Sequence, residues 1–410
     1  MIMPTIAVIG GGIAGSVIAK QLADQGLNVV IAYRQASNEY KAGETLPPNA
    51  NNLLSRLGIT HMLESGEHMR CPGNQSAFGL EALTDVDFLY SPQGLGWHLD
   101  RVLFEKQLLA ATKQSGVHQL ANYRFLSAER KSNKWLLSFS TDDKSIDSKA
   151  KSVKEYYVDY VIDASGTERT LVKKLAIQQH QFDQMAARVA VFNVNQTREQ
   201  QDHRTMIEAS ENGWWYSSSA PNSKRIVMFF GHKTDSVFRT SGKFEYFVQH
   251  LQQTKYIWQK LQNEIQLANN ADTLNKSSML SNEQMNIENV LKQGGAFYTK
   301  PAFTSLSTTI QGQGWLAIGD AAMAFDPLSS QGMYIAMQGA EKAAEQIQYL
   351  YKNNLLTSEV NVSKYTQWAE KTFQTYMQER QKYYALEQRW PNSTFWQQRA
   401  QDTSLAAISN

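Results

Sequence analysis

Short apolar runs and one helical pattern alternate near the start of the chain. Residues 5–9 form an apolar run followed at once by glycines, which indicates a buried parallel strand. Apolar residues then recur at positions 13, 17, 18, 22 and 23 with helical spacing, and residues 28–32 form a second apolar run. A strand, a helix and a strand in this order predict the first unit of a parallel sheet covered by helices.

Glycines occupy the turn between this first strand and the helix. Gly10 permits a tight turn, Gly12 lets the backbone approach a pyrophosphate, and Gly15 lets the helix and the strand pack closely. The phosphates would lie against the N-terminus of the helix, next to Ala14. The alternative is a glycine-rich turn that binds nothing, and it is disfavoured because the strand, the helix and the second strand are all in place.

The end of the second strand departs from the usual dinucleotide site. An acidic residue normally follows this strand and binds the ribose hydroxyls. Here the chain has Tyr33 and Arg34 instead. Either Glu39 or Glu44 reaches the ribose, or a backbone group and Arg34 hold that end of the nucleotide.

A similar pattern returns late in the sequence. Residues 314–319 predict a buried strand, and Asp320 follows at its carboxyl end, where open α/β sheets bind ligands. An acid there can accept hydrogen bonds from ribityl hydroxyls. A helical pattern begins near Gln331 and continues to Ala344. Backbone N–H groups at the start of that helix suit the anionic edge of reduced flavin. An ordinary strand, loop and helix is the alternative. The predicted cofactor contacts are Asp320, Pro327, Gln331, Gly332 and Met333.

Three further segments carry polar groups that could face a flavin. Glu44 lies in a Gly-Glu-Thr-Leu-Pro segment and is expected to position the cofactor. Arg101 begins a helical pattern and could reach flavin or phosphate oxygens as a charge-assisted donor. Residues 157–163 predict a strand that ends in Asp163, and Gly166 follows three residues later. These residues complete the predicted cofactor site.

Taken in order and spacing, these segments resemble the single-Rossmann FAD-dependent monooxygenases of the p-hydroxybenzoate hydroxylase fold. Residues 43–47 (Gly-Glu-Thr-Leu-Pro) and 163–167 (Asp-Ala-Ser-Gly-Thr) look like the flavin-dependent halogenase branch of that group. Two halogenase signatures are absent: the chain has no Trp-x-Trp-x-Ile-Pro, and no lysine lies between Lys41 and Lys106. The sequence therefore argues against halogenation.

A narrower resemblance covers almost the whole chain. Residues 208–217, 326–332, 384–390 and 395–399 look like the LodB/GoxB-like flavoproteins, which assist cysteine tryptophylquinone biosynthesis in quinoprotein amino-acid oxidases. The resemblance implies a tryptophan side chain of a precursor protein as substrate. We expect the aromatic residues of the last two segments to form a core rather than a docking surface.

The resemblance also implies a reaction. FAD and O2 would give a flavin C4a-hydroperoxide, whose distal oxygen hydroxylates the electron-rich indole. No second glycine-rich fingerprint for NAD(P)H is visible. The electrons would come from transient NAD(P)H binding or from a separate reductase. Two other functions stay open: a monooxygenase or halogenase-like enzyme for a small aromatic metabolite, and a non-catalytic flavoprotein that acts as a maturation chaperone.

The fold that the resemblance implies is α/β, with a Rossmann-like FAD-binding domain, an inserted antiparallel β-sheet substrate domain and a helical C-terminus. The expected bounds are 1–75, 96–182 and 296–350 for the FAD-binding domain, 76–95 and 183–295 for the substrate domain, and 351–410 for the helical segment. Within the insertion, apolar patterns predict strands at 186–192, 213–218 and 225–230, a helix at 244–261, and a polar loop or surface helix at 269–286.

The candidates for catalysis are Glu44, His98 and Tyr216, because they are the polar groups expected near the flavin and a base helps the ring regain aromaticity. Each has a structural alternative. His98 could be a core histidine with both nitrogens bonded, Tyr216 a half-buried sheet residue, and Glu44 a positioning group. Trp214 and Trp215 in the same strand are expected to cover the flavin or to belong to the core.

Composition narrows the picture further. The chain has 410 residues and a net charge of +2, so bulk electrostatics do not indicate nucleic-acid binding. The single cysteine, Cys71, excludes an internal disulfide framework and fits a reducing compartment. No signal peptide and no membrane span are recognisable, so the expected location is cytoplasmic. The eight histidines lack ligand spacing, which predicts no metal site.

Overall fold

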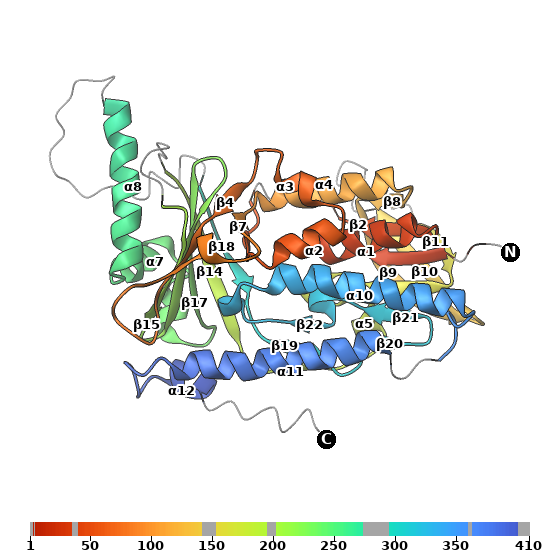
Figure 1. The fold of residues 1–410 in the computed structure, drawn as a ribbon. Coiled ribbons are helices and arrows are strands. Elements are labelled where there is room, and N and C mark those ends of the chain that lie inside the picture. The colour runs from red at the N-terminus through yellow and green to blue at the C-terminus, as the bar shows by residue number, and fades with distance from the viewer. Residues whose placement is uncertain are drawn as a thin grey trace.

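A six-stranded sheet contains both of the N-terminal strands that the apolar runs predict (Figure 1). The structure is a computed structural model that describes residues 3, 5–34, 40–141, 153–194, 202–273, 295–359 and 363–400. Neighbouring strands of this sheet are parallel, apart from one antiparallel strand at its edge. In spatial order they are β20 (Gln311–Gly312), β21 (Trp315–Ala317), β12 (Tyr160–Asp163), β1 (Thr5–Ile9), β2 (Asn28–Tyr33) and β8 (His118–Ala121).

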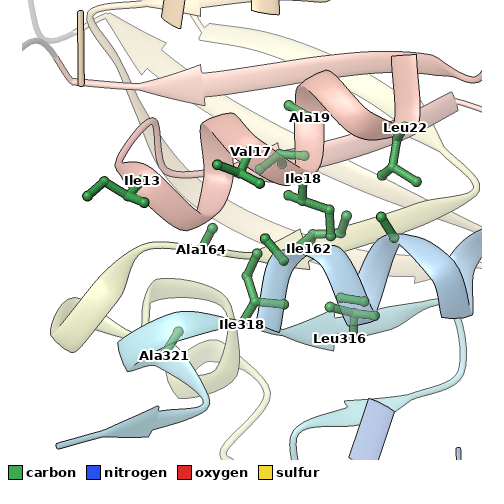
Figure 2. Close-up of a cluster of buried hydrophobic side chains, with 14 of the residues drawn as sticks. Ile13, Val17, Ile18, Ala19, Leu22, Ile162, Ala164, Leu316, Ile318 and Ala321 are labelled. Atoms are coloured by element: carbon green, nitrogen blue, oxygen red, sulfur yellow. The ribbon is translucent and has the colours of Figure 1, made fainter. Parts of the chain in front are cut away.

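Three helices pack together beside this sheet: α1 (Ile13–Asp24), α4 (Arg101–Gln114) and α10 (Gly332–Lys352). Figure 2 shows Ile18 and Leu22 of α1 in one apolar cluster with Ile162 of β12 and Leu316 of β21. The helical spacing of the apolar residues therefore places one face of α1 in the core. The predicted helix near residues 331–344 is confirmed as the start of α10.

The second large sheet has seven strands and is antiparallel, except where β15 runs parallel to β5. In Figure 1 its green strands lie at the end of the molecule opposite to the label N. The predicted strands at 186–192, 213–218 and 225–230 are confirmed at its centre. In spatial order the strands are β18 (Ala296–Pro301), β14 (Met185–Asn193), β17 (Lys224–His232), β16 (Gly213–Ala220), β15 (Thr205–Ser210), β5 (Gly73–Ala77) and β6 (Thr84–Asp87).

The two faces of this sheet belong to different cores. Trp214 and Phe230 lie on one face, and Trp215 and Phe229 lie on the other. Period-two alternation along the strands causes this division. The second face is covered by α7 (Phe244–Leu251) and α8 (Tyr256–Thr273), and α6 (Ser236–Thr240) packs beside them.

Three small antiparallel sheets and several short helices complete the described fold. The sheets are β9 (Tyr123–Lys131), β10 (Lys134–Thr141) and β11 (Val153–Val158); β13 (Gln179–Gln181), β19 (Ser305–Ser307) and β22 (Met323–Ala324); and β3 (Thr45–Leu46), β7 (Gly96–His98) and β4 (Met69–Cys71). The short helices are α2 (Ala50–Arg56), α3 (Thr60–Leu63) and α5 (Thr170–Lys174). The mixed α/β fold class is thereby confirmed.

The C-terminal part is helical, as predicted. Helix α11 (Lys364–Ala385) runs along the molecule past both large sheets, and α12 (Thr394–Ala400) follows it (Figure 1). Phe395 and Trp396 are buried against the seven-stranded sheet, so the core interpretation of this aromatic cluster is confirmed. No helix among the described residues is long and apolar enough to cross a membrane.

Two predicted elements are broken in the structure. The expected strand at 157–163 is two strands in different sheets, β11 and β12, and Asp159 lies between them and accepts a hydrogen bond from the Thr5 N–H at 2.8 Å. The expected helix at 244–261 is divided into α7 and α8, because the Glu208 carboxylate accepts the backbone N–H groups of Tyr256 and Ile257 at the start of α8. Side-chain capping of this kind is not visible in apolar periodicity.

A sequence-based domain boundary also differs from the strand assignments. Strand β18 lies in the seven-stranded sheet, although the expected bounds place residues 296–301 in the FAD-binding domain. The polar segment at 269–286 belongs to α8 as far as Thr273, and the rest of it lies outside the described residues. The division of the chain into domains stays a prediction.

Candidate active site

A single pocket of about 1150 Å³ is lined by both large sheets. This volume exceeds the roughly 300–1,000 Å³ that is usual for sites of drug-sized ligands. The predicted site residues that line it are Gly10, Gly12, Ala14, Arg34, Arg101, Gly166, Tyr216, Asp320, Pro327, Gly332 and Met333. The structure thus brings together, in one cavity, residues from the two ends of the sequence.

The glycine turn forms one wall of the pocket and shows why each glycine is needed. Gly10 has a φ of +112°, and a Cβ there would lie 2.3 Å from the carbonyl oxygen of Ala164. A Cβ on Gly15 would lie 1.9 Å from the carbonyl oxygen of Gly10. Gly12 differs, because a Cβ there would meet no protein atom within 4 Å. The backbone at Gly12 is therefore open to a ligand, as a pyrophosphate at a helix N-terminus requires.

The adenosine end of the predicted site contains Tyr33 and Arg34, which both line the pocket. Arg34 forms an ion pair with Glu168 at 2.5 Å, and both side chains are about half exposed. Glu39 lies outside the described residues. Glu44 is fully buried and bonded elsewhere. Among the alternatives for the ribose, the structure thus places Arg34 at the pocket and directs Glu44 away from it.

Asp320 shares its part of the pocket with two cations, Arg101 and Lys300. Arg101 donates to the carbonyl oxygen of Gly43 at 2.7 Å, and Lys300 donates to that of Ala42 at 3.2 Å. Protein atoms surround Asp320 and Lys300 on most sides, yet both side chains remain accessible through the pocket. An acid and two cations at one wall can bind hydroxyl groups and an anion together.

Burial and the neighbouring Arg101 lower the pKa of Lys300 to about 8, although Asp320 opposes this shift. Burial raises the pKa of Asp320, and Lys300 and Arg101 oppose that rise. The sequence analysis missed Lys300. Its signal was weak, since a single lysine at the end of an edge strand has no characteristic pattern, and only the pairing of β18 with β14 carries it to the pocket.

Side chains of α11 hold Asp326, which begins the loop leading to α10. The Asp326 carboxylate accepts the hydroxyl of Tyr384 at 2.6 Å and the backbone N–H of Leu328 at 2.9 Å. The backbone N–H of Asp326 donates to Tyr376 at 2.7 Å. Arg380 adds an ion pair at 3.5 Å. Pro327, Gly332 and Met333 line the pocket, whereas Gln331 is not part of its lining.

Asp163 and Gly166 differ in their relation to the pocket. Gly166 lines it, but the Asp163 carboxylate faces the chain itself. One carboxylate oxygen accepts the Ser165 N–H and hydroxyl, and the other accepts the backbone N–H groups of Leu171 and Val172 at 2.9 and 3.0 Å. These bonds give Asp163 a role in shaping the turn and the start of α5, and a direct contact with FAD stays a prediction.

Glu44 and Tyr216 form the centre of a buried hydrogen-bond chain. The Tyr216 hydroxyl donates to a Glu44 carboxylate oxygen at 2.8 Å, and Ser218 donates to the same oxygen. Thr45 contacts Tyr216 at 2.7 Å and the Nδ1 of His98 at 3.1 Å. The other nitrogen of His98 is 2.7 Å from the carbonyl oxygen of His203. Tyr216 and Thr45 line the pocket, whereas Glu44 and His98 lie behind them.

The protons of this chain can be assigned from its geometry. Each hydroxyl has one proton, so Tyr216, which donates to Glu44, must accept from Thr45. Thr45 must then accept from Nδ1 of His98, while Nε2 of His98 donates to the His203 carbonyl. All these bonds therefore form together only when both His98 nitrogens carry protons. Burial would lower the pKa of His98, but the nearby Cys71 and the His203 carbonyl outweigh it, and the pKa is raised. Burial and Glu44 raise the pKa of Tyr216 well above its ordinary value. Tyr216 therefore stays protonated and acts as a donor.

His98 is thus a fully buried histidine with both nitrogens bonded, as its structural alternative predicts. A catalytic role for it would operate through Thr45 and Tyr216 and stays a prediction. Trp214 lines the pocket, stacks on Phe230 with ring centroids 3.9 Å apart, and donates its indole N–H to Tyr384 at 3.0 Å. Trp215 is on the opposite face of the sheet and does not line the pocket.

Comparison with known proteins gives a consistent result. The sequence pattern of the tryptophan halogenase family matches residues 80–409 of the chain. LodB of Marinomonas mediterranea, described as an FAD-dependent oxidoreductase, is 25% identical over 405 residues, which cover 98% of each chain.

Solved structures share the fold at lower identity. The flavin-dependent halogenase CmlS aligns with a TM-score of 0.74 and 21% identity, over 100% of this chain and 70% of that one. QhpG, described as a peptidyl tryptophan dihydroxylase essential for tryptophylquinone cofactor biogenesis, aligns with a TM-score of 0.69 and 18% identity, over 97% of this chain and 79% of that one. At these identities the likeness of the structures shows the fold.

Proposed function

The chain belongs to the tryptophan halogenase family of flavin-dependent oxidoreductases, and we propose that it is an FAD-dependent monooxygenase acting on protein-bound tryptophan. Its substrate would be a tryptophan side chain in the precursor of a quinoprotein oxidase, hydroxylated during cysteine tryptophylquinone maturation. FAD supplies the oxygen-activating chemistry when bound. NAD(P)H or a separate reductase supplies the electrons.

The observation that carries the proposal is the composition of the pocket. The glycine turn that suits a pyrophosphate and an aromatic wall on the seven-stranded sheet line the same cavity. The aromatic residues of that wall are Trp214, Tyr216 and Phe230, and Met228 lies in the same sheet beside them. A planar, electron-rich ring such as indole can stack against such side chains, and the wall keeps water from the reacting atoms. The full-length likeness to LodB, an FAD-dependent oxidoreductase, supports the reaction class. The fold shared with QhpG, a peptidyl tryptophan dihydroxylase, supports the substrate class.

The chain's own residues would bind and orient the reactants. Gly12 and the start of α1 would hold the pyrophosphate, and Asp320 would accept hydrogen bonds from ribityl hydroxyls. The loop 327–332, braced by α11, would present backbone N–H groups to the flavin edge. Tyr216, whose single proton is bonded to Glu44, would offer its hydroxyl oxygen as an acceptor on the substrate side of the pocket, where an indole N–H could donate to it.

A second candidate is a halogenase-like enzyme for a small aromatic metabolite. The observation that favours it is Lys300, whose amino group lies in the same pocket as Thr45, the residue that follows Glu44 in the chain. The sequence argues against it, since no lysine lies between Lys41 and Lys106 and the Trp-x-Trp-x-Ile-Pro segment is absent. We therefore rank hydroxylation first.

The experiment is mass spectrometry of a quinoprotein precursor co-expressed with and without this protein. We expect added oxygen on one tryptophan when the protein is present. Gly12→Val, which directs a side chain into the open part of the pocket, should abolish the modification. The same purified protein should then be given NAD(P)H or a flavin reductase, chloride or bromide, and free indole compounds.

The outcomes separate the candidates. An unmodified tryptophan beside an FAD-loaded protein and an intact precursor contradicts the proposal. A halogenated indole product then supports the second candidate. If the precursor matures only in the presence of the protein, but without any oxygen-dependent turnover, the protein acts as a chaperone and not as an enzyme.

A further inference from the structure

Helix α11 contributes no residue to the lining of the large pocket, yet one of its faces holds Asp326 at the start of the flavin loop, residues 327–332. Tyr376, Arg380 and Tyr384 are spaced four positions apart, so their side chains lie on the same side of the helix. The backbone N–H of Asp326 donates to the Tyr376 hydroxyl at 2.7 Å. The Asp326 carboxylate accepts the Tyr384 hydroxyl at 2.6 Å and pairs with Arg380 at 3.5 Å.

Tyr384 differs from the other two residues because it also contacts the aromatic wall of the pocket. Its hydroxyl oxygen accepts the indole N–H of Trp214 at 3.0 Å. Trp214 lines the pocket from β16, and its ring stacks on Phe230. Tyr384 itself is fully buried. One buried hydroxyl thus joins Asp326, at the start of the flavin loop, to the aromatic wall.

The directions of these hydrogen bonds follow from the protons available. An indole N–H can only donate, so the Tyr384 oxygen accepts from Trp214. The single proton of Tyr384 goes to the Asp326 carboxylate, because the other acceptor nearby, the sulfur of Met185 at 3.8 Å, is weak. Burial and the nearby Asp326 raise the pKa of Tyr384 well above its ordinary value, so this proton stays in place.

We propose that Tyr384 is a positioning residue that couples the flavin loop to the aromatic wall, so that a change at Trp214 alters how the loop binds FAD. Asp326 carries the effect into the loop, because its other carboxylate oxygen accepts the backbone N–H of Leu328 at 2.9 Å. Coupling between two sites is reciprocal, so FAD at the loop also changes the wall. Under the proposed function, on which this last step rests, indole and cofactor would affect each other's binding.

The test is a double-mutant cycle on FAD affinity, measured by fluorescence titration of the full-length FAD-free protein. Trp214→Phe keeps an aromatic ring but removes the N–H, and we expect FAD affinity to fall by about threefold or more. In a Tyr384→Phe background, which has already lost the hydroxyl, the same substitution should change FAD affinity much less. The cycle uses no substrate, so its result is independent of whether the protein hydroxylates tryptophan.

Trp215→Phe and Tyr376→Phe are the matched controls. Trp215 is the next residue of the same strand but lies on the opposite face of the sheet, so its substitution should leave FAD affinity unchanged. Tyr376→Phe removes a hydrogen bond between α11 and Asp326 but keeps the one between Tyr384 and Trp214. In that background, Trp214→Phe should still lower FAD affinity by the same factor as in wild type.

Hydrogen–deuterium exchange of residues 326–332 in the FAD-free protein is a second measurement. Because the Leu328 N–H is bonded to Asp326, exchange should become faster in Trp214→Phe and stay as in wild type in Trp215→Phe. Equal losses of FAD affinity from Trp214→Phe with and without the Tyr384 hydroxyl would mean that Trp214 contacts FAD directly, which would overturn the proposal. Unchanged affinity together with unchanged exchange in Trp214→Phe would overturn it as well.

Discussion

The two ends of the large pocket are built in different ways. At the glycine turn, the wall is backbone, and Gly10, Gly12 and Gly15 lie within six residues of one another in the sequence. At the aromatic wall, the groups are side chains from distant segments, and Tyr216 reaches Glu44 across 172 positions. The first end depends on what is missing, namely Cβ atoms, and the second depends on hydrogen bonds that must all form together.

Because of this difference, the two ends of the pocket are sensitive to opposite kinds of substitution. A backbone wall fails when an atom is added, because a clash with another backbone atom cannot be relieved by a rotamer change. A side-chain network fails when an atom is removed, because a buried partner is left unsatisfied. Substitutions of both kinds therefore test the comparison, and their expected effects fall in a definite order.

The largest effect is expected for Gly15→Val. The new Cβ would lie 1.9 Å from the carbonyl oxygen of Gly10, so α1 and the turn must separate. We expect the free energy of unfolding to fall by about 3 kcal/mol or more, at the upper end of overpacking effects. Urea denaturation of the FAD-free protein measures it.

Gly12→Ala is the matched control for Gly15→Val. Its Cβ meets no protein atom within 4 Å, so the stability of the FAD-free protein should be unchanged. FAD affinity should fall about tenfold or more, since an overpacked contact costs roughly 1–3 kcal/mol. If both variants lose stability equally, or if Gly12→Ala binds FAD normally, the backbone end does not hold the pyrophosphate.

The glycine end could be predicted from the sequence because its contacts are local. Strand β1, the turn and α1 follow one another, and apolar spacing together with three glycines describes them. The residues of the aromatic end could be predicted from the sequence only in part. Glu44 and Tyr216 were recognised as candidates, but their direct hydrogen bond depends on the antiparallel pairing of β16 with its neighbours.

Lys300 and the bracing of Asp326 by α11 were not predicted at all. Each arises where two elements far apart in the chain come together, β18 beside β14 and α11 beside the flavin loop. Side-chain capping was missed for the same reason, since Glu208 on β15 caps the start of α8, 48 positions along the chain, and so divides α7 from α8. Hydrophobic periodicity gives the elements and their buried faces, but it does not specify which polar groups meet between them.

A smaller effect is expected at the side-chain end for Tyr216→Phe. Glu44 loses one of its donors, and Thr45 loses a partner. We expect the free energy of unfolding to fall by about 1–3 kcal/mol, the cost of leaving a buried polar group unsatisfied. Tyr40→Phe is the control, because the Tyr40 hydroxyl is 3.4 Å from Glu44 and contributes a weaker bond. A Tyr40→Phe variant that is as unstable as Tyr216→Phe would contradict the ordering of these bonds.

The smallest effect is expected for Lys300, which lines the same pocket as both ends, and it takes the form of a pH dependence. The pKa of Lys300 in the folded protein is lowered from 10.5 to about 8, by burial and by Arg101. Below pH 8 both the folded and the unfolded chain carry the proton, and the folded state bears the full cost of a charged amine. As the pH rises above 8, the folded state releases the proton while the unfolded state retains it, so the unfolded state binds more protons and stability increases with pH.

Lys300→Met removes this dependence. In FAD-free protein at about pH 7, the variant should therefore be the more stable of the two, and its advantage over wild type should shrink at about pH 9.5. Because Lys300 stays accessible through the pocket, water screens its charge and the change is modest. Urea denaturation of both proteins at the two pH values measures the difference. A difference in stability that stays constant with pH would show that Lys300 keeps an ordinary pKa, and that the cations at this wall do not act on one another.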